Sequence, residues 1–514
     1  MNNKRHPHPH TTKLITLALI PLLATTSIHA QVQDPYLNAQ TTTQDDIYGT
    51  SRSVAMGGAL GALGADISTI SANPAGTAIM SGTTATITAG AIWLSNASQA
   101  TRRGFGDIQA TFDQIGIVTT LNTKGKIHNV SLAFNYQKRQ NYLAAHFSNA
   151  DSNTSWAHQL HNMSQYALTT PYDPTIYYDA NRYGVIAIED DQWYTKTHSH
   201  NTIGETTGSI NGYDINLSTN IQDRYYLGLT LGFDQVLFDN YIDYQEYRSD
   251  KDDPNINHDF GFVNHQHIRG TGVNLKIGTI IRPFADTPLR FGLTIETPTW
   301  YSLKYHDSQS VITHFYDHKD QLIYDPQHSY EHYNQTDNYT TYRLVTPWKF
   351  RLQAGCTHSN TIAWGAEYQY ATHTTYHPHV LTGQHTLRAG FEIRPLSWLS
   401  LRAGYNYISS IHRPQAYWNP VEINPNLSPR ENDLAVDYPT SLQYTNLSDT
   451  HIYTAGIGFR YKRLTADIAY KYRHQTGQHH AYYSVDTQGQ PIETPGTKIN
   501  LTRQQLTATL GIKF

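Results

Sequence analysis

The sequence contains a single cysteine, Cys356, among its 514 residues. One cysteine excludes the disulfide framework that holds many small secreted domains together. Long apolar runs are also missing. The longest uncharged apolar stretch, from Leu14 to Ala24, has eleven residues, whereas a membrane-spanning helix needs about 20. We therefore expect no helical membrane anchor.

The short apolar run lies in the order of a secretory signal peptide. Lys4, Arg5 and Lys13 precede the run, and a small residue, Ala30, stands before Gln31. Such an order predicts export, with residues 1–30 as the signal peptide. Because the residue after the expected cut is not a cysteine, we expect no lipid anchor at the new N-terminus.

Charged side chains are scarce, at 15% of the chain. Without the three basic residues of the leader, 34 Lys and Arg residues stand against 41 Asp and Glu residues. This balance excludes nucleic acid as a partner. Aromatic residues and glycine are abundant instead, with 38 Tyr, 15 Phe, 8 Trp and 34 Gly, at a mean hydropathy of −0.53. Transmembrane β-barrels show this combination, because only one face of each strand is apolar.

From about residue 84 onward, apolar and polar residues alternate in segments of roughly ten residues, the period of a strand with two different faces. In the last segment, one face consists of Leu506, Ala508, Leu510, Ile512 and Phe514. We predict 14 strands, near residues 84–94, 110–121, 127–138, 210–220, 225–238, 268–283, 288–300, 343–357, 361–372, 384–395, 398–409, 451–461, 464–474 and 501–513.

The predicted connections alternate in length. They are short after strands 2, 4, 6, 8, 10 and 12 and long after the others, as in outer-membrane barrels with periplasmic turns and extracellular loops. We therefore predict an all-β fold, a 14-stranded antiparallel transmembrane β-barrel over residues 83–514. It would be a multi-pass protein of the outer membrane of a Gram-negative cell.

The alternation also assigns the two faces of the wall. The residues expected to face lipid include Leu289, Phe291, Leu293 and Ile295, and also Cys356, which shares its face with Phe350, Leu352 and Ala354. Those expected in the lumen include Arg290, Gly292, Thr294, Glu296, Arg388, Glu392, Arg394 and Arg402. Tyrosines at strand ends predict an aromatic girdle at the membrane interfaces: Tyr136, Tyr368, Tyr370, Tyr405, Tyr407 and Tyr461.

Residues 31–82, between the signal peptide and the first strand, are rich in Gly and Ala and lack strand alternation. Glycines permit close backbone approach, and Asn-Pro-Ala-Gly is a turn-forming run. We expect this segment to form a compact plug, or hatch, inside the lumen. The candidate ligand or hatch residues are Met56, Gly57, Gly58, Asp66, Asn73, Pro74, Ala75 and Gly76.

These motifs resemble the FadL family of outer-membrane transporters for long-chain fatty acids and aromatic hydrocarbons. The resemblance includes Met56-Gly-Gly-Ala59, the later Asp66 and Asn73-Pro-Ala-Gly76, with a second similarity through Gly270–Gly278 and Leu289–Pro298. It implies passive uptake of a hydrophobic small molecule. A rearrangement of the hatch, hinged at Asn73, Pro74 and Ala75, would let the ligand leave through a gap in the barrel wall. The polar, aromatic loop near residues 301–342 departs from the fatty-acid members, so the ligand stays open between fatty-acid-like and aromatic compounds.

Two other functions stay open. Histidine pairs can ligate haem iron or transition metals, and His265–His267, His377–His379 and His479–His480 make a haem-binding receptor one alternative. A non-transporting outer-membrane protein that binds secreted cargo is the other. A loop at residues 250–255 gathers oxygen ligands but lacks the glycine and distal glutamate of an EF-hand.

The sequence shows no hydrolase, metalloprotease or redox motif, so we expect no enzyme and no cofactor. The expected partners are a hydrophobic small-molecule ligand, the lipid and lipopolysaccharide of the outer membrane, and the barrel assembly machinery during biogenesis.

Overall fold

The computed structural model describes residues 45–95, 108–150, 194–250, 257–284, 286–316, 336–359, 361–373, 381–412, 444–481, 484–485, 491–492 and 496–514. The predicted signal peptide lies outside them. Within these ranges the helices are short, and none is long and apolar enough to cross a membrane.

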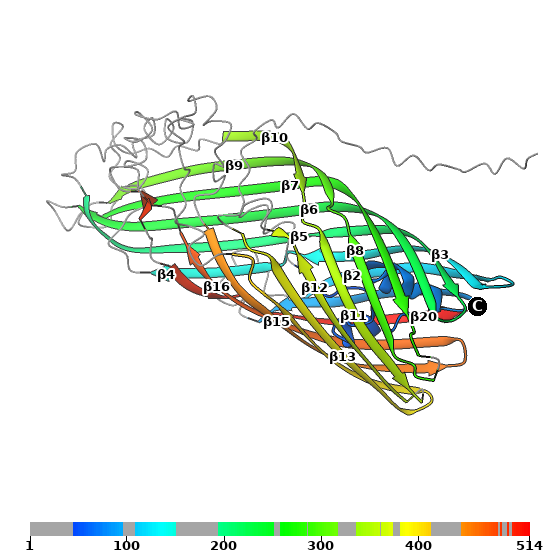
Figure 1. Cartoon of the computed structure of the whole chain (residues 1–514). Helices are drawn as coiled ribbons and strands as arrows, with labels where there is room; N and C mark the ends of the chain where they lie inside the picture. The colour runs from blue at the N-terminus through cyan, green and yellow to red at the C-terminus, as the bar shows by residue number, and fades with distance from the viewer. Residues whose placement is uncertain are drawn as a thin grey trace, which may run out of the picture.

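The described strands form one closed, antiparallel 14-stranded barrel, as predicted (Figure 1). The wall closes because β1 pairs with both β2 and β20. Its first seven strands are β1 (Thr83–Leu94), β2 (Gln109–Asn122), β3 (Ile127–Asn141) continued by β4 (Ala144–Ala150), β5 (Tyr194–Ile221), β6 (Tyr225–Asp250), β7 (Asn257–Ile281) and β8 (Arg290–Glu296) continued by β9 (Trp300–Tyr316).

The remaining seven are β10 (Thr336–Val345) continued by β11 (Lys349–His358), β12 (Ile362–Ala371), β13 (Gln384–Leu396), β14 (Leu399–Ile408), β15 (Tyr444–Tyr461), β16 (Leu464–His480) and β19 (Gly496–Asn500) continued by β20 (Arg503–Lys513). Two short segments, β17 (Ser484–Val485) and β18 (Pro491–Ile492), pair with each other apart from the wall.

The two faces of the wall differ as the alternation predicts. On β6, Leu227, Leu229, Leu231 and Phe233 are 38–47% exposed on the outside, whereas Thr230 between them is fully buried. Exposed apolar residues of this kind recur on the neighbouring strands. A continuous outward belt of apolar side chains is the lipid-facing surface of a transmembrane barrel.

Several strands run further outward than predicted. β5 has 28 residues and β6 has 26, and Figure 1 shows them with β7 and β9 extending well beyond the shorter strands. The prediction stopped at residues 210 and 238 because the apolar alternation fades there. We infer that these outer segments project past the lipid, where neither face needs to be apolar.

Two predicted strands, 288–300 and 343–357, are not continuous, and here the prediction was wrong. The breaks lie at Thr297–Thr299 and Thr346–Trp348, each around a proline, which has no backbone N–H for the ladder. The two breaks lie side by side. The Thr346 amide donates to the Thr299 carbonyl at 3.1 Å, and the Thr299 amide donates to Thr346 Oγ1 at 2.8 Å.

The third strand of the wall bends. β3 pairs with β2 only as far as Gln114 opposite Gln137, and the chain then shifts register against β5 between Lys138 and Gln140. After the bend, β4 remains paired with β5 and lies against β19. The pairing of β2 with β3 therefore stops partway up the wall.

Candidate functional site

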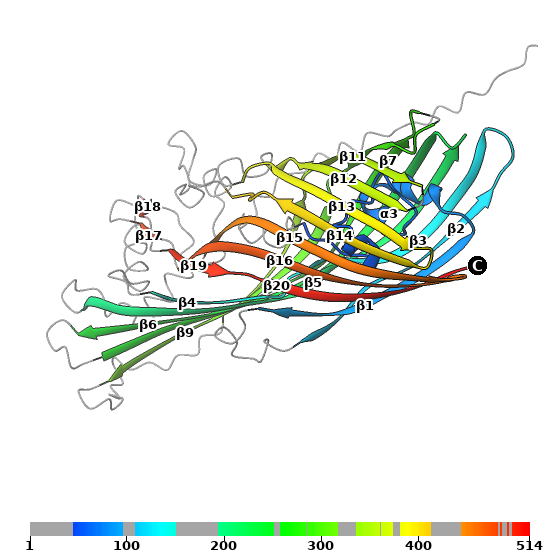
Figure 2. The same cartoon turned by 90° about the horizontal axis from the view of Figure 1, so that it is seen from below.

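The segment before β1 folds inside the barrel as three short helical pieces, α2 (Ser51–Ala55), α3 (Thr69–Ala72) and the 3-10 helix η1 (Pro74–Ile79). Figure 2 shows this hatch enclosed by the wall strands. Asp66 joins its parts. Its carboxylate accepts from the Thr50 hydroxyl at 2.9 Å and from the Ser68 amide at 2.9 Å. Arg52 Nη1 also forms an ion pair with Asp66 Oδ2 at 3.9 Å.

A row of wall glycines receives the first part of the hatch. The row consists of Gly355, Gly365, Gly390 and Gly404, which are direct neighbours across β11, β12, β13 and β14. A Cβ atom on Gly390 would collide with the Met56 carbonyl, and one on Gly365 with the Ala59 carbonyl. The hatch backbone therefore rests directly on the wall backbone.

The hatch itself bends through left-handed glycines at this seat. Gly57 and Gly58 have φ values of +63° and +77°, which other residues rarely adopt. Met56 is fully buried and packs with Leu60 and Leu63. These positions shape the fit of the hatch to the wall.

Asn73, Pro74 and Ala75 have a second seat on β6, β7 and β11. Asn73 Nδ2 donates to Gln353 Oε1 at 2.7 Å and to the Thr279 carbonyl at 3.1 Å. Its Oδ1 accepts from the Ala75 amide at 3.1 Å, which caps η1. Asn73 is therefore bonded to the wall and to its own helix at once.

The first described residues of the hatch are anchored by charge. Asp45 pairs with Lys349 at 2.9 Å and with Arg388 at 3.4 Å. Asp46 pairs with Lys471 at 2.9 Å and also with Arg503. Burial would raise the pKa of each carboxyl group, but the adjoining cations outweigh it and hold both pKa values well below the usual range. Both aspartates are therefore ionised.

A polar cavity of about 150 Å³ lies between the hatch and the wall. Charged side chains of both signs line it, including Asp45, Arg139, Lys276, Glu296, Lys349 and Arg388. Many of these charges are paired, as in the 2.6 Å contact of Arg139 with Asp214. The lumen next to the hatch is thus strongly polar.

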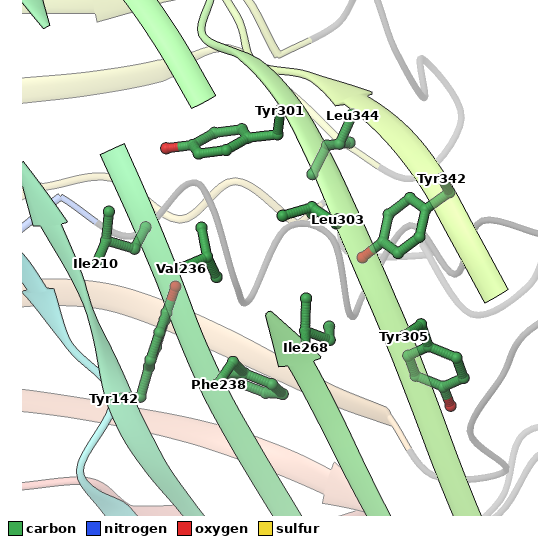
Figure 3. Packing of buried hydrophobic residues seen from close by; sticks show 10 residues of the cluster. All are labelled: Tyr142, Ile210, Val236, Phe238, Ile268, Tyr301, Leu303, Tyr305, Tyr342 and Leu344. Atoms are coloured by element: carbon green, nitrogen blue, oxygen red, sulfur yellow. The ribbon is translucent and has the colours of Figure 1, made fainter. Parts of the chain in front are cut away.

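An apolar surface adjoins this cavity on the inner side of the wall. Its residues, hereafter the inner apolar surface, pack together in Figure 3: Tyr142, Ile210, Val236, Phe238, Ile268, Tyr301, Leu303, Tyr305, Tyr342 and Leu344. Tyr142 and Phe238 meet edge to face with ring centroids 5.0 Å apart. Ile210 and Tyr301 also line the polar cavity, so the two regions are continuous.

Tyr301 and Tyr305 of this surface have partners for their hydroxyl groups. Tyr301 donates to Asp234 Oδ2 at 3.0 Å, and Tyr305 accepts from Gln266 at 3.0 Å. Such rings present an apolar body with a satisfied polar tip. These two hydroxyl groups are therefore paired beside apolar rings.

The two described histidine pairs lie on different strands, β7 and β16. His265 and His267 stand on the outer face of β7, alternating with the buried inward Gln266 and Ile268. His479 and His480 are buried at the end of β16. The pair at 377–379 and most of the 250–255 loop lie outside the described residues. Among the residues that are described, no group of three or more His, Cys, Asp or Glu side chains is arranged to hold a metal ion.

Other predicted positions fall where the alternation placed them. Arg388, Glu392 and Arg402 form ion pairs inside the barrel. The girdle tyrosines lie on the outer face, where Tyr368 and Tyr405 hydrogen-bond to His385 and His451 at 2.8 and 2.9 Å. Tyr461 is the last residue of β15, at the end that leads into the short turn to β16.

Sequence reasoning missed the inner apolar surface and the anchors of Asp45 and Asp46. Part of this surface lies on strand extensions that carry no lipid-facing signal. The anchors join residues about 300 to 460 positions apart, as in Asp45 with Lys349 and Asp46 with Arg503. The only signal for the inner apolar surface in the sequence was an apolar residue such as Phe or Leu at an inward position, as at Phe238 on β6, a strand that also carries polar inward residues.

These features define a class: a 14-stranded transmembrane β-barrel whose lumen is occupied by an N-terminal hatch. Searches of solved structures find the same fold in the crystal structure of a Pseudomonas aeruginosa FadL homologue, with 12% identity, a TM-score of 0.50, and coverage of 91% of this chain and 99% of that one. The P. putida toluene transporter TodX matches with 12% identity, a TM-score of 0.46, and coverage of 91% and 99%.

No protein-family model matches the sequence, and no curated protein is significantly similar to it. The fold expected from the resemblance is confirmed.

Proposed function

We propose that this protein is a channel of the Gram-negative outer membrane for passive uptake of hydrophobic small molecules. The observation that carries the proposal is the inner apolar surface beside a hatch that occupies the lumen. A ligand from outside would rest against this surface, beginning at its least buried members Tyr305, Leu344 and Tyr342, before meeting the hatch. Removing an apolar molecule from water onto such a surface is favourable, by about 25 cal/mol per Å².

Passage then requires the hatch to move. Its Asn73–Ala75 seat depends on a few hydrogen bonds and on the absence of side chains at Gly228 and Gly278. We take this seat as the hinge, with Met56–Gly58 and Asp66 holding the rest of the hatch in shape and Gly76 packed against Thr69. The tyrosines of the inner apolar surface suit an aromatic ligand as well as an acyl chain.

The bend of the third strand supports a lateral exit. Above Gln114 and Gln137 the pairing of β2 with β3 ends. A hollow of about 1230 Å³ on the lipid-facing side includes Ile115 and Phe134 near this position and extends along the outer face to Trp398. We infer that the ligand leaves through the wall here, into the lipid. Lipid and lipopolysaccharide would surround the outer belt, and the barrel assembly machinery would insert it.

The test is ligand identification. The mature protein is purified from its own outer membrane in mild detergent, and extracted small molecules are compared by mass spectrometry with a mock purification. Enriched fatty acids or aromatic compounds support the proposal and name the ligand class. Haem would support the haem-receptor alternative. Co-purified secreted proteins without an apolar ligand would support cargo binding.

A further inference from the structure

Two histidine rings meet where β4, the continuation of the bent third strand, lies against β19. His146 of β4 and His479 of β16 have ring centroids 4.4 Å apart, with planes inclined at 52°. β4 pairs along its length with β5, whereas the end of β16 pairs with β15 and β19. The contact thus joins two strands that are not partners in the sheet.

The ring nitrogens of this pair are incompletely used. His479 Nδ1 hydrogen-bonds with the Thr445 hydroxyl at 3.0 Å. The Nε2 atoms of His479 and His146 are both shielded from solvent, and neither has a hydrogen-bond partner among the described residues. A buried, unpaired polar atom costs about 1–3 kcal/mol. Both Nε2 atoms therefore remain available to a bound group.

The position of the rings is fixed by their surroundings. Gly204 lies opposite His146 in the β4–β5 pair, and a Cβ atom at Gly204 would collide with the His146 ring. His479 is only 2% exposed, and its Thr445 contact orients the ring. A hydrogen bond on one ring nitrogen that directs the other outward is the usual arrangement around a metal-binding histidine.

We propose that His146 and His479 bind one divalent transition-metal ion through their Nε2 atoms, which ties β4 to β16 at the outer part of the lumen. Imidazole ligands suit zinc, nickel and copper, with Cu²⁺ bound most tightly in this series. Since the described residues provide no third ligand in place, water completes the coordination. The proposal is independent of the uptake function.

The experiment is a Cu²⁺ titration of the mature, detergent-solubilised protein at pH 7, followed by electron paramagnetic resonance. We expect one tightly bound ion with coordination by two imidazole nitrogens. His146→Gln and His479→Gln should each weaken binding by at least about tenfold, the scale expected when a ligand or its support is lost. Gly204→Val, which displaces the His146 ring without removing it, should act in the same direction.

The control is the double variant His265→Ala/His267→Ala. These rings are also close, with centroids 4.5 Å apart, but they lie on the outer face and His267 is held by Asp239. Binding should be unchanged in this variant. Copper affinity that is unaltered by His146→Gln and His479→Gln, or lost only in the control, would overturn the proposal. Heat-modifiability on gels establishes that each variant barrel is assembled.

Discussion

Gly228 and Gly278 lie directly opposite each other on β6 and β7, and Pro74 of the hatch rests on both. A Cβ atom at Gly278 would come within 2.7 Å of Pro74 Cδ and would collide with Asn73 Oδ1. The hatch and the wall are therefore fitted to each other through two residues without side chains.

Gly278→Val should displace the Asn73–Ala75 segment while leaving the barrel assembled. Overpacking of this kind costs about 1–3 kcal/mol. We expect this cost to destabilise the hatch and not the wall, because the wall is held by the hydrogen bonds between its strands. Hydrogen exchange at residues 73–80 should accelerate. The matched control is Thr279→Val, on the opposite face of the same strand. Equal exchange rates at residues 73–80 in Gly278→Val and Thr279→Val would contradict a close contact between the hatch and Gly278.

Asp66→Ala should loosen the whole hatch. It removes the acceptor for the Thr50 hydroxyl and the Ser68 amide, and one of the two counter-ions of Arg52, which keeps Glu392. Leaving the buried hydroxyl and amide without this acceptor should cost about 1–3 kcal/mol, and hydrogen exchange of amides 50–68 measures the loss. Asp66→Asn retains one acceptor oxygen, so its amide exchange should be faster than in the native protein and slower than in Asp66→Ala. A mutant hatch as protected as the native one would show that Asp66 is dispensable.

The anchor of Asp46 should weaken in acid. Its pKa in the folded protein is lower than in the unfolded chain, because Lys471 and Arg503 outweigh the effect of burial. The ionised form therefore stabilises the fold above the unfolded pKa of about 3.9, and this contribution declines as the pH falls below about 4. Amide exchange of the hatch, corrected for intrinsic rates at pH 7 and pH 3.5, measures the loss. Asp46→Asn should be less stable at pH 7 and less sensitive to acid.

Phe238→Ala should weaken binding of an apolar ligand, on the proposed function. Phe238 is fully buried on the inner face of β6, whereas Phe233 on the same strand is 41% exposed to the outside. Losing the buried ring should lower affinity, because the ring supports the inner apolar surface that the ligand would cover, and each Å² of apolar area no longer removed from water costs about 25 cal/mol. Titration with a fluorescent fatty acid and with a monoaromatic compound measures it. Phe233→Ala is the control, and an equal effect in both variants would argue against the inner apolar surface as the binding site.

Most of the barrel follows from the sequence because lipid imposes a rule on every second residue. Leu227 to Phe233 satisfy that rule, and their strand was predicted from its first residue. Beyond Phe238 the rule no longer applies, and the extensions of β5, β6 and β7 were missed. The breaks at Pro298 and Pro347 were visible as residues, but their side-by-side placement depends on the pairing of β9 with β10.

The hatch could be located but not fitted. Met56–Gly58 and Asn73–Gly76 were recognised as a turn-rich plug, yet what they touch was not predictable. Their seats consist of glycines on β6, β7 and β11–β14, more than 150 residues later. A wall glycine carries no pattern that distinguishes it from a loosely packed strand position. The contact partners therefore appear only when the barrel is closed.

The row of Gly355, Gly365, Gly390 and Gly404 makes the hatch a check on assembly. The four glycines align only when β11 to β14 are in the correct register. A slip of one residue in any of these strands turns its glycine outward and a lipid-facing side chain inward, against the path of the Met56–Leu63 backbone. A barrel that closes with one of these strands in the wrong register therefore cannot accommodate the hatch. Only a barrel with the correct register can have its lumen filled by it.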